Sequence, residues 1–180
     1  MPLPSCTRIG FYDRDKAKTL LANGWREIEV LETWYGRTKW ELGDLIEAGP
    51  QHREKLMKIA RAVFTHDRLH KDPLVDKKDA DEFKAKCISD AIDDYDRRVF
   101  INRNDPTAFL SIWAGGTGVA QIDLVASMTR GAAETLIKRA VVKLLVHDLE
   151  ANTQSTNEKA RRLYAGLGMR VIRRQRTFHK

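Results

Sequence analysis

The chain has 180 residues, of which 42% are hydrophobic and 32% charged, values typical of a soluble globular protein with one well-buried core. No apolar run approaches the roughly 20 residues of a membrane-spanning helix, and the N-terminal residues lack the pattern of a secretory signal. The net charge of +7 favours anionic partners: nucleic acid, a membrane surface or a phosphate-bearing small molecule. The two cysteines, Cys6 and Cys87, make no disulfide framework, which predicts a cytoplasmic protein with reduced thiols.

The first predicted element is a short helix in DRDKAKTLLANG, residues 13–24. Asp13 or Asp15 can cap its first turn, and Gly24 suits the left-handed position after its end. Further along, the segment ELGDLIEAGPQHRE, residues 41–54, contains two glycines and a proline and is the best candidate for a linker.

Between these two segments lies WREIEVLETWYG, residues 25–36. Its hydrophobic Ile28 and Val30 alternate with Glu27 and Glu29, which is the spacing of a strand. Regular alternation of this kind predicts that the two glutamates lie on one face of the strand and the two aliphatic residues on the other.

The remaining elements are predicted from hydrophobic periodicity and turn residues. Helical spacing predicts helices at 54–64, 77–94, 131–145 and 157–168. Alternation predicts strands at 97–102, 107–114, 119–127, 147–154 and 169–180, with turns at 104–106 and 115–118. This order predicts an α/β fold with a mixed, mostly antiparallel sheet flanked by helices. We expect a small N-terminal helix–strand unit at 1–48 and a main domain at 49–180.

The junction IDLVASMTRGAAETLI, residues 122–137, has the features of an anion-binding site. A strand ends, a short loop follows, and a helix begins whose first N–H groups have no partner within the helix. The small residues Gly131, Ala132 and Ala133 would let a phosphate approach these groups, and Arg130 adds positive charge. On the residues alone, an ordinary helix start with a glycine remains an open alternative.

This junction resembles the coenzyme loop of the GCN5-related N-acetyltransferases, which reads Arg or Gln, two residues, Gly, one residue, then Gly or Ala. Gly131 and Ala133 match this pattern, whereas Met128 stands in the place of the Arg or Gln. The resemblance implies the acetyltransferase fold and acetyl-CoA as co-substrate, and it also implies that a backbone N–H at Leu124 or Val125 stabilises the oxyanion. The coenzyme-binding residues that it implies are Leu124, Val125, Arg130, Gly131, Ala132, Ala133, Glu134, Thr135, Asn157 and Tyr164.

The stretch TQSTNEKARRLYAGLGM resembles a second motif of the same family, TQ-x-x-N-x-x-A-x-x-x-Y-x-x-x-G followed by an apolar residue. The matching residues are Thr153, Gln154, Asn157, Ala160, Tyr164, Gly168 and Met169. In the family, the Asn side chain contacts the coenzyme and the Tyr hydroxyl lies near its sulfur. Tyr164 is therefore the expected general acid for the departing thiolate, a role that a phenol can fill within hydrogen-bond reach. Without the resemblance, Tyr164 would be read as a core aromatic residue beside Ala160 and Leu167.

Two weaker elements, RLHKDP at 68–73 and TFHK at the chain end, resemble the branch that acetylates dTDP-linked 4-amino-sugars. The resemblance points to Arg68, His70 and Asp72 as substrate-binding residues. His70, Asp72 and His179 are also candidates for the base that deprotonates the amine. Each has an ordinary alternative: an exposed loop histidine, a turn aspartate before a proline, and a frayed end. Water could serve as the base in place of all three.

The predicted function is therefore transfer of an acetyl group from acetyl-CoA to a primary amine on a small, nucleotide-linked amino sugar. Two other readings remain open: an acceptor amine on a modified nucleic acid, a polyamine or a protein, and a binding module that has lost catalysis. The cysteines and tryptophans show no spacing of metal ligands, so we expect no metal. No membrane partner is expected, and pairing of two chains as a homodimer through their terminal strands is left open.

Overall fold

The computed structural model describes all residues except 1–2, 104–105 and 116–117, so the predicted turns at 104–106 and 115–118 lie partly outside the described residues. The strands are β1 Cys6–Gly10, β2 Arg26–Arg37, β3 Ile46–Glu47, β4 Arg97–Ile101, β5 Ala108–Gly115, β6 Val119–Ser127, β7 Asp148–Gln154 and β8 Arg170–His179. The helices are α1 Arg14–Ala22, α2 Arg53–Val63, α3 Arg68–Lys71, α4 Lys77–Asp93, α5 Ala132–Leu144 and α6 Glu158–Gly166, with a 3-10 turn at Pro50–His52.

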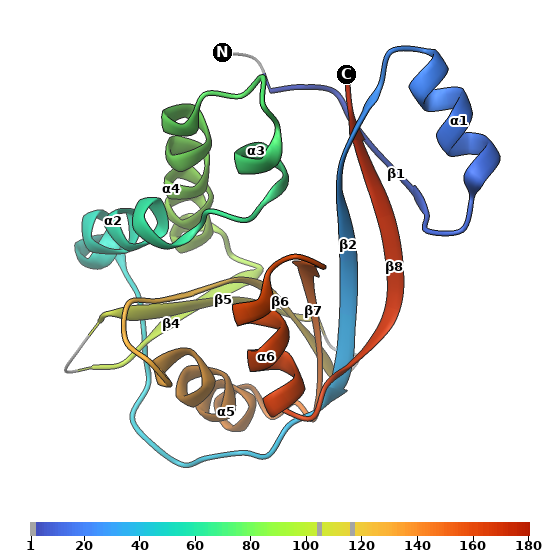
Figure 1. Cartoon of the computed structure of the whole chain (residues 1–180). Helices are drawn as coiled ribbons and strands as arrows, with labels where there is room; N and C mark the ends of the chain where they lie inside the picture. The colour runs from blue at the N-terminus through green and yellow to red at the C-terminus, as the bar shows by residue number, and fades with distance from the viewer. Residues whose placement is uncertain (1–2, 104–105, 116–117) are drawn as a thin grey trace.

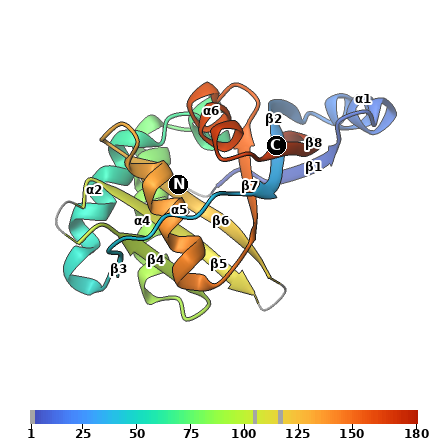
Figure 2. The same cartoon turned by 90° about the horizontal axis from the view of Figure 1, so that it is seen from below.

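One eight-stranded sheet runs in the order β1-β8-β2-β7-β6-β5-β4-β3. Its neighbouring strands pair antiparallel, apart from the parallel pair β6 and β7. Helices α5 and α6 cover one face, and α2 and α4 cover the other (Figure 1). Seen from below, α5 lies across β4, β5 and β6 (Figure 2). The predicted fold class, a mixed and mostly antiparallel sheet flanked by helices, is confirmed.

Two hydrophobic cores fill the space between the sheet and its helices. On the α5 and α6 side, Leu136 and Ile137 of α5 pack on Leu110 and Ile112 of β5. On the opposite side, α2 and α4 pack on the other face of β4 to β6, with Phe109 at the centre. Each helix therefore buries the apolar stripe that its spacing predicted, and burial of this kind supplies the main driving force for folding.

The N-terminal strands are built into the same sheet as the rest of the chain. Strand β2 lies between β7 and β8, so it hydrogen-bonds on both edges to the C-terminal part of the sequence. Strand β1, which sequence periodicity did not reveal, pairs with β8 at the edge. Helix α1 packs on this end through a small core of Ile9, Ala17 and Phe178. The segments 1–48 and 49–180 thus contribute to one sheet.

A bulge in β6 shapes the centre of the sheet. Ser111 of β5 pairs with Leu124, but the next residue, Ile112, pairs with Ile122, which leaves Asp123 as the extra residue. A bulge increases the local twist and bends the strand that carries it. At the same point β6 stops pairing with β7, because Ile122 and Ala151 form the last paired positions of these parallel strands. Beyond them the two strands separate.

Candidate active site

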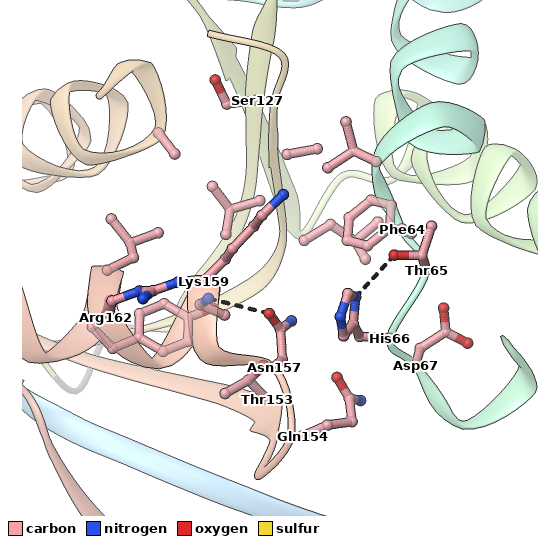
Figure 3. A pocket seen from close by; sticks show the side chains of 18 of the residues that line it. Phe64, Thr65, His66, Asp67, Ser127, Thr153, Gln154, Asn157, Lys159 and Arg162 are labelled. Atoms are coloured by element: carbon pink, nitrogen blue, oxygen red, sulfur yellow. Dashed lines mark hydrogen bonds between the residues drawn. The ribbon is translucent and has the colours of Figure 1, made fainter. Parts of the chain in front are cut away.

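The separation of β6 and β7 opens a cavity of about 720 Å³. Residues 123–127 of β6 and 152–154 of β7 line it from the sheet, and residues 62–67 line it from the end of α2. Residues 130, 131, 133 and 134 line it at the start of α5, and residues 157, 159, 160 and 162–164 line it from α6. Figure 3 shows Thr65, His66 and Asp67 facing Gln154 and Asn157 across this space. The volume lies within the range of small-molecule sites, and the cavity reaches both faces of the sheet.

The start of α5 forms one wall of the cavity and is open to an anion. Gly131 precedes the helix with φ 83°, a left-handed conformation that strains residues with a side chain. No side chain caps this helix, and no atom lies within 4 Å of where a Cβ on Gly131 would stand. Among the described residues, the N–H groups of Ala133 and Glu134 have no acceptor. Unsatisfied N–H groups at the positive end of a helix attract phosphate.

Tyr164 reaches the cavity from α6, although its side chain is largely buried. It is 3% exposed and its ring lies 6.0 Å from that of Trp34, so it is also a member of the core. In the described part of the chain no hydrogen-bond partner acts on its hydroxyl. Burial raises the pKa of the phenol, which keeps it protonated at neutral pH. A protonated, unpaired hydroxyl at a cavity wall can donate a proton to a group bound there.

Asn157 has a structural role that leaves half of its side chain free. Its Oδ1 accepts a hydrogen bond of 3.2 Å from the N–H of Ala160, so it caps α6 (Figure 3). The NH₂ group of the amide remains available to donate into the cavity. Beside it, Thr153 and Gln154 at the end of β7 also line the cavity.

Basic side chains surround the part of the cavity near α6. Lys159 and Arg162 project from α6 and Arg130 from the loop before α5 (Figure 3 labels the first two). Lys159 makes no ion pair among the described residues, and Arg162 makes only a loose, exposed one of 3.8 Å to Glu158. These side chains place positive charge where a phosphate group could be bound.

The predicted base and substrate candidates Asp72, His179 and Arg68 lie together, but outside the residues that line the cavity. Nδ1 of His179 lies 2.8 Å from Oδ2 of Asp72, and its Nε2 lies 3.1 Å from Arg68. Because a guanidinium only donates, Nε2 accepts and Nδ1 carries the hydrogen that binds Asp72. Arg26 of β2 also pairs with Asp72. His179 is fully buried, so the chain end is locked by this cluster and is not frayed.

The carboxyl of Asp72 is held ionised by its partners. Burial alone would raise its pKa, but hydrogen bonds from Arg26, from the N–H of Leu74 and from His179 outweigh that effect and lower the pKa to about 2. A carboxylate that is so strongly stabilised is a poor acceptor for a proton from an amine. The arrangement indicates that this cluster ties the loop before α4 to β2 and β8.

His70 is also placed away from the cavity. Its Nδ1 lies 2.6 Å from Oδ2 of Asp67 and its Nε2 lies 3.0 Å from Oδ1 of Asp81. The side chain is only 4% exposed, so both ring nitrogens are engaged between two carboxylates. His70 thus joins α3 to α4 in this conformation, and no nitrogen faces the space between β6 and β7.

The structure brings together most of the residues expected to bind coenzyme. Those that line the cavity are Leu124, Val125, Arg130, Gly131, Ala133, Glu134, Asn157 and Tyr164. Ala132 and Thr135 do not line it, and Ala132 packs partly into the core. Residues that sequence reasoning did not assign to the site are Phe64, Thr65, His66, Asp67, Lys84, Asp123, Asn152, Lys159 and Arg162. The position of Lys159 and Arg162 beside Asn157 in the sequence is a signal that could have found these two.

No protein-family model matches the chain, and no curated protein is significantly similar to it in sequence. Among solved structures, a functionally unknown conserved protein from Staphylococcus epidermidis has a TM-score of 0.68 at 13% identity, covering 97% of this chain and 72% of its own. A GCN5-related N-acetyltransferase from Sphaerobacter thermophilus has a TM-score of 0.57 at 13% identity, covering 98% and 60%. The fold is that of the GCN5-related N-acetyltransferases.

An acetyltransferase of the GNAT family (the same fold) from Colwellia psychrerythraea gives a TM-score of 0.58 at 14% identity, covering 98% of this chain and 65% of its own. This chain therefore spans about 60–65% of the length of the two acetyltransferases. At such identities the likeness establishes the GNAT fold, while activity has to be argued from the site. Within the described residues, no helix is long and apolar enough to cross a membrane, and no cluster of His, Cys, Asp or Glu could hold a metal ion.

Proposed function

We propose that this protein transfers an acetyl group from acetyl-CoA to a primary amine. The observation that carries the proposal is the gap between β6 and β7, which leads from the uncapped start of α5 to the hydroxyl of Tyr164. The residues present suit the coenzyme. Gly131 leaves room for close approach, free N–H groups and Arg130 favour a diphosphate, and the free edge of β6 can pair with an extended arm as a strand would.

The reaction draws on two groups of the protein. An acceptor amine that has lost its proton attacks the thioester carbonyl carbon, and the negative charge that develops on the carbonyl oxygen needs a hydrogen-bond donor. We assign this role to a backbone N–H at Leu124 or Val125, on the unpaired edge of β6. The C–S bond then breaks, and the phenol of Tyr164 gives its proton to the departing thiolate. The new amide nitrogen loses its extra proton, which returns to the phenolate directly or through water.

The acceptor class is the finer part of the proposal. The sequence resemblance of RLHKDP and TFHK supports a nucleotide-linked amino sugar, and the basic residues at the cavity are compatible with its diphosphate. Arg68, Asp72 and His179 of those two elements form a buried cluster, and no residue of either element lines the cavity. Their contribution to acceptor binding would therefore be indirect, through the position of the loop at 65–67.

The proposal is tested by coenzyme binding and by turnover. Millimolar acetyl-CoA should raise the melting temperature, because a ligand that binds only the native state stabilises it. Thiol release should then be followed with a panel of amines that includes a nucleotide-linked 4-amino-sugar, spermidine, a lysine peptide and an amine-bearing oligonucleotide. No rise in melting temperature would exclude the proposal. Release of thiol with the oligonucleotide alone would overturn the amino-sugar assignment and keep the chemistry.

A further inference from the structure

Arg173 of β8 carries a positive charge that no carboxylate neutralises. Its side chain is exposed, and among the described residues it makes no ion pair. Two other arginines of the same strand do, because Arg174 pairs with Glu32 and Arg176 pairs with Glu27. Within the described chain, the hydrogen bond that Arg173 makes runs from Nε to the hydroxyl of Thr33, at 3.3 Å. Its two terminal NH₂ groups are therefore left to bind an anion, which a guanidinium can do with two parallel hydrogen bonds.

The hydroxyl of Thr33 links Arg173 to the wall of the cavity. Thr33 is only 1% exposed, and its Oγ1 lies 2.8 Å from Oδ1 of Asn152 on β7. Because a guanidinium only donates, the hydroxyl accepts from Arg173 and gives its own hydrogen to Asn152. The amide oxygen of Asn152 thus faces Thr33, and its NH₂ group is left to donate elsewhere. Asn152 is exposed and lines the cavity.

These three residues form a polar row across three neighbouring strands, β8, β2 and β7 (Figure 1). In the register of the sheet, Thr33 is paired with both Arg173 and Asn152. The preceding residue, Glu32, points to the face that carries α6, where an arginine of that helix binds it. Successive residues of a strand point to opposite faces, so the polar row lies on the other face. Residues 62–67 at the end of α2 line the cavity on that side.

Resting on the proposed acetyl transfer, we infer that the polar row binds a phosphate group of the acceptor. Arg173 supplies the positive charge and two N–H donors, and Asn152 donates a further hydrogen bond from the cavity wall. The acceptor is therefore an amine that also carries phosphate. The diphosphate of the coenzyme is assigned to the start of α5, beside Arg130 and Gly131. The two substrates thus place their phosphates at different sites and do not compete.

The acidic side chains of the cavity are held by partners other than Arg173. Oδ2 of Asp67 lies 2.6 Å from Nδ1 of His70, and Oδ2 of Asp123 accepts a hydrogen bond from Arg97. The charge of Arg173 consequently stays available to a ligand. It attracts a phosphate and repels a second cation, so it favours a nucleotide-linked amino sugar over a polyamine.

The first test measures binding without turnover. CoA is added to saturation, so that the coenzyme site is closed to other phosphates, and UDP is then titrated by calorimetry. We expect the wild type to bind UDP and Arg173→Gln to bind it about 10-fold to 100-fold more weakly, the loss typical of a hydrogen bond to a charged group. The control Arg170→Gln removes an exposed arginine of the same strand that makes no ion pair in the described structure, and it should bind UDP as the wild type does.

The second test compares the nucleotide-linked 4-amino-sugar of the panel with the same amino sugar lacking the nucleotide. Arg173→Gln should raise KM for the first by a factor similar to the loss in UDP affinity. It should leave KM for the second unchanged, and kcat for both. Thr33→Val, which removes the bridging hydroxyl and keeps a branched side chain, should reduce the preference for the nucleotide-linked sugar in the same direction.

Three results would overturn the inference: no binding of UDP to the complex of wild type and CoA, equal UDP affinities of wild type and Arg173→Gln, or an equal loss of turnover with both sugars. The last result would indicate that Arg173 has a structural role. If the wild type binds no acetyl-CoA, the proposed function fails. Titration of UDP into the free wild type and Arg173→Gln still tests the polar row in that case, so the two failures are distinguishable.

Discussion

The buried carboxyl of Glu29 makes a prediction about stability that is independent of any substrate. Glu29→Gln keeps the size and shape of the side chain and removes the charge. Because burial of the wild-type carboxylate outweighs the favourable effect of its neighbours, the variant should be more stable than the wild type at alkaline pH.

The magnitude follows from the pKa. Burial raises the pKa of Glu29 from 4.5 to about 7, and each pKa unit corresponds to about 1.4 kcal/mol, so the ionised form costs about 3 kcal/mol. The direction of the pH dependence follows from the raised pKa of this carboxyl group. The folded state holds its proton more tightly than the unfolded state, so stability falls as the pH rises from about 4.5 to about 7 and the cost is complete above that range.

Urea unfolding of wild type and Glu29→Gln at about pH 5 and about pH 8 measures this cost. The advantage of the variant in free energy of unfolding should be about 2–3 kcal/mol larger at the higher pH. Comparing two pH values cancels any fixed effect of the new amide. Glu27→Gln, which loses only a partly exposed ion pair, should show little dependence on pH. An equal difference at both pH values would show that burial does not raise the pKa of Glu29, and would refute the reasoning.

Three further predictions concern the site and its support. Tyr164→Phe should lower kcat by about 10²-fold to 10⁴-fold and leave the Kd for acetyl-CoA unchanged. The control Tyr95→Phe, at an exposed tyrosine, should leave both values unchanged. Unchanged turnover of Tyr164→Phe would mean that another group protonates the thiolate. Gly131→Ala should cost ~1–2 kcal/mol of stability and weaken acetyl-CoA binding in calorimetry. The control Gly24→Ala, also at positive φ but outside the cavity, should cost a similar amount of stability and leave the affinity for acetyl-CoA intact. Equal affinities of the two variants would show that the diphosphate binds elsewhere. Asp72→Asn should lower the free energy of unfolding at neutral pH by about 2 kcal/mol or more. This loss should disappear as the pH falls from about 4 to about 2, because the wild-type carboxylate becomes protonated in that range. A loss of stability that does not depend on pH would contradict the assigned ion cluster.

Much of the fold is readable in the sequence because its elements are locally consistent. The apolar stripe at Leu136, Ile137, Ala140 and Val141 gives α5, and the motif around Asn157 gives the cap and start of α6. Strand β1 was missed because the short segment has no strong alternation. Helix α3 was missed because it is a single turn within a polar loop.

The site and its surroundings are harder to read because they depend on irregularities of the strands. Alternation predicts Glu27 and Glu29 on one face, but the bulge at Ile28 reverses the second of them. The bulge at Asp123 and the separation of β6 from β7 arise from tertiary packing, and no local residue pattern specifies them. Likewise, nothing local indicates that His179 would meet Asp72 across the chain.

The most direct test of the account is a crystal structure of the protein with acetyl-CoA bound. We expect the pantetheine arm between residues 123–127 of β6 and 152–154 of β7, the diphosphate on the N–H groups at 130–134, and the sulfur beside the hydroxyl of Tyr164. Coenzyme bound outside this gap, or a gap filled by side chains from the two strands, would contradict the central claim.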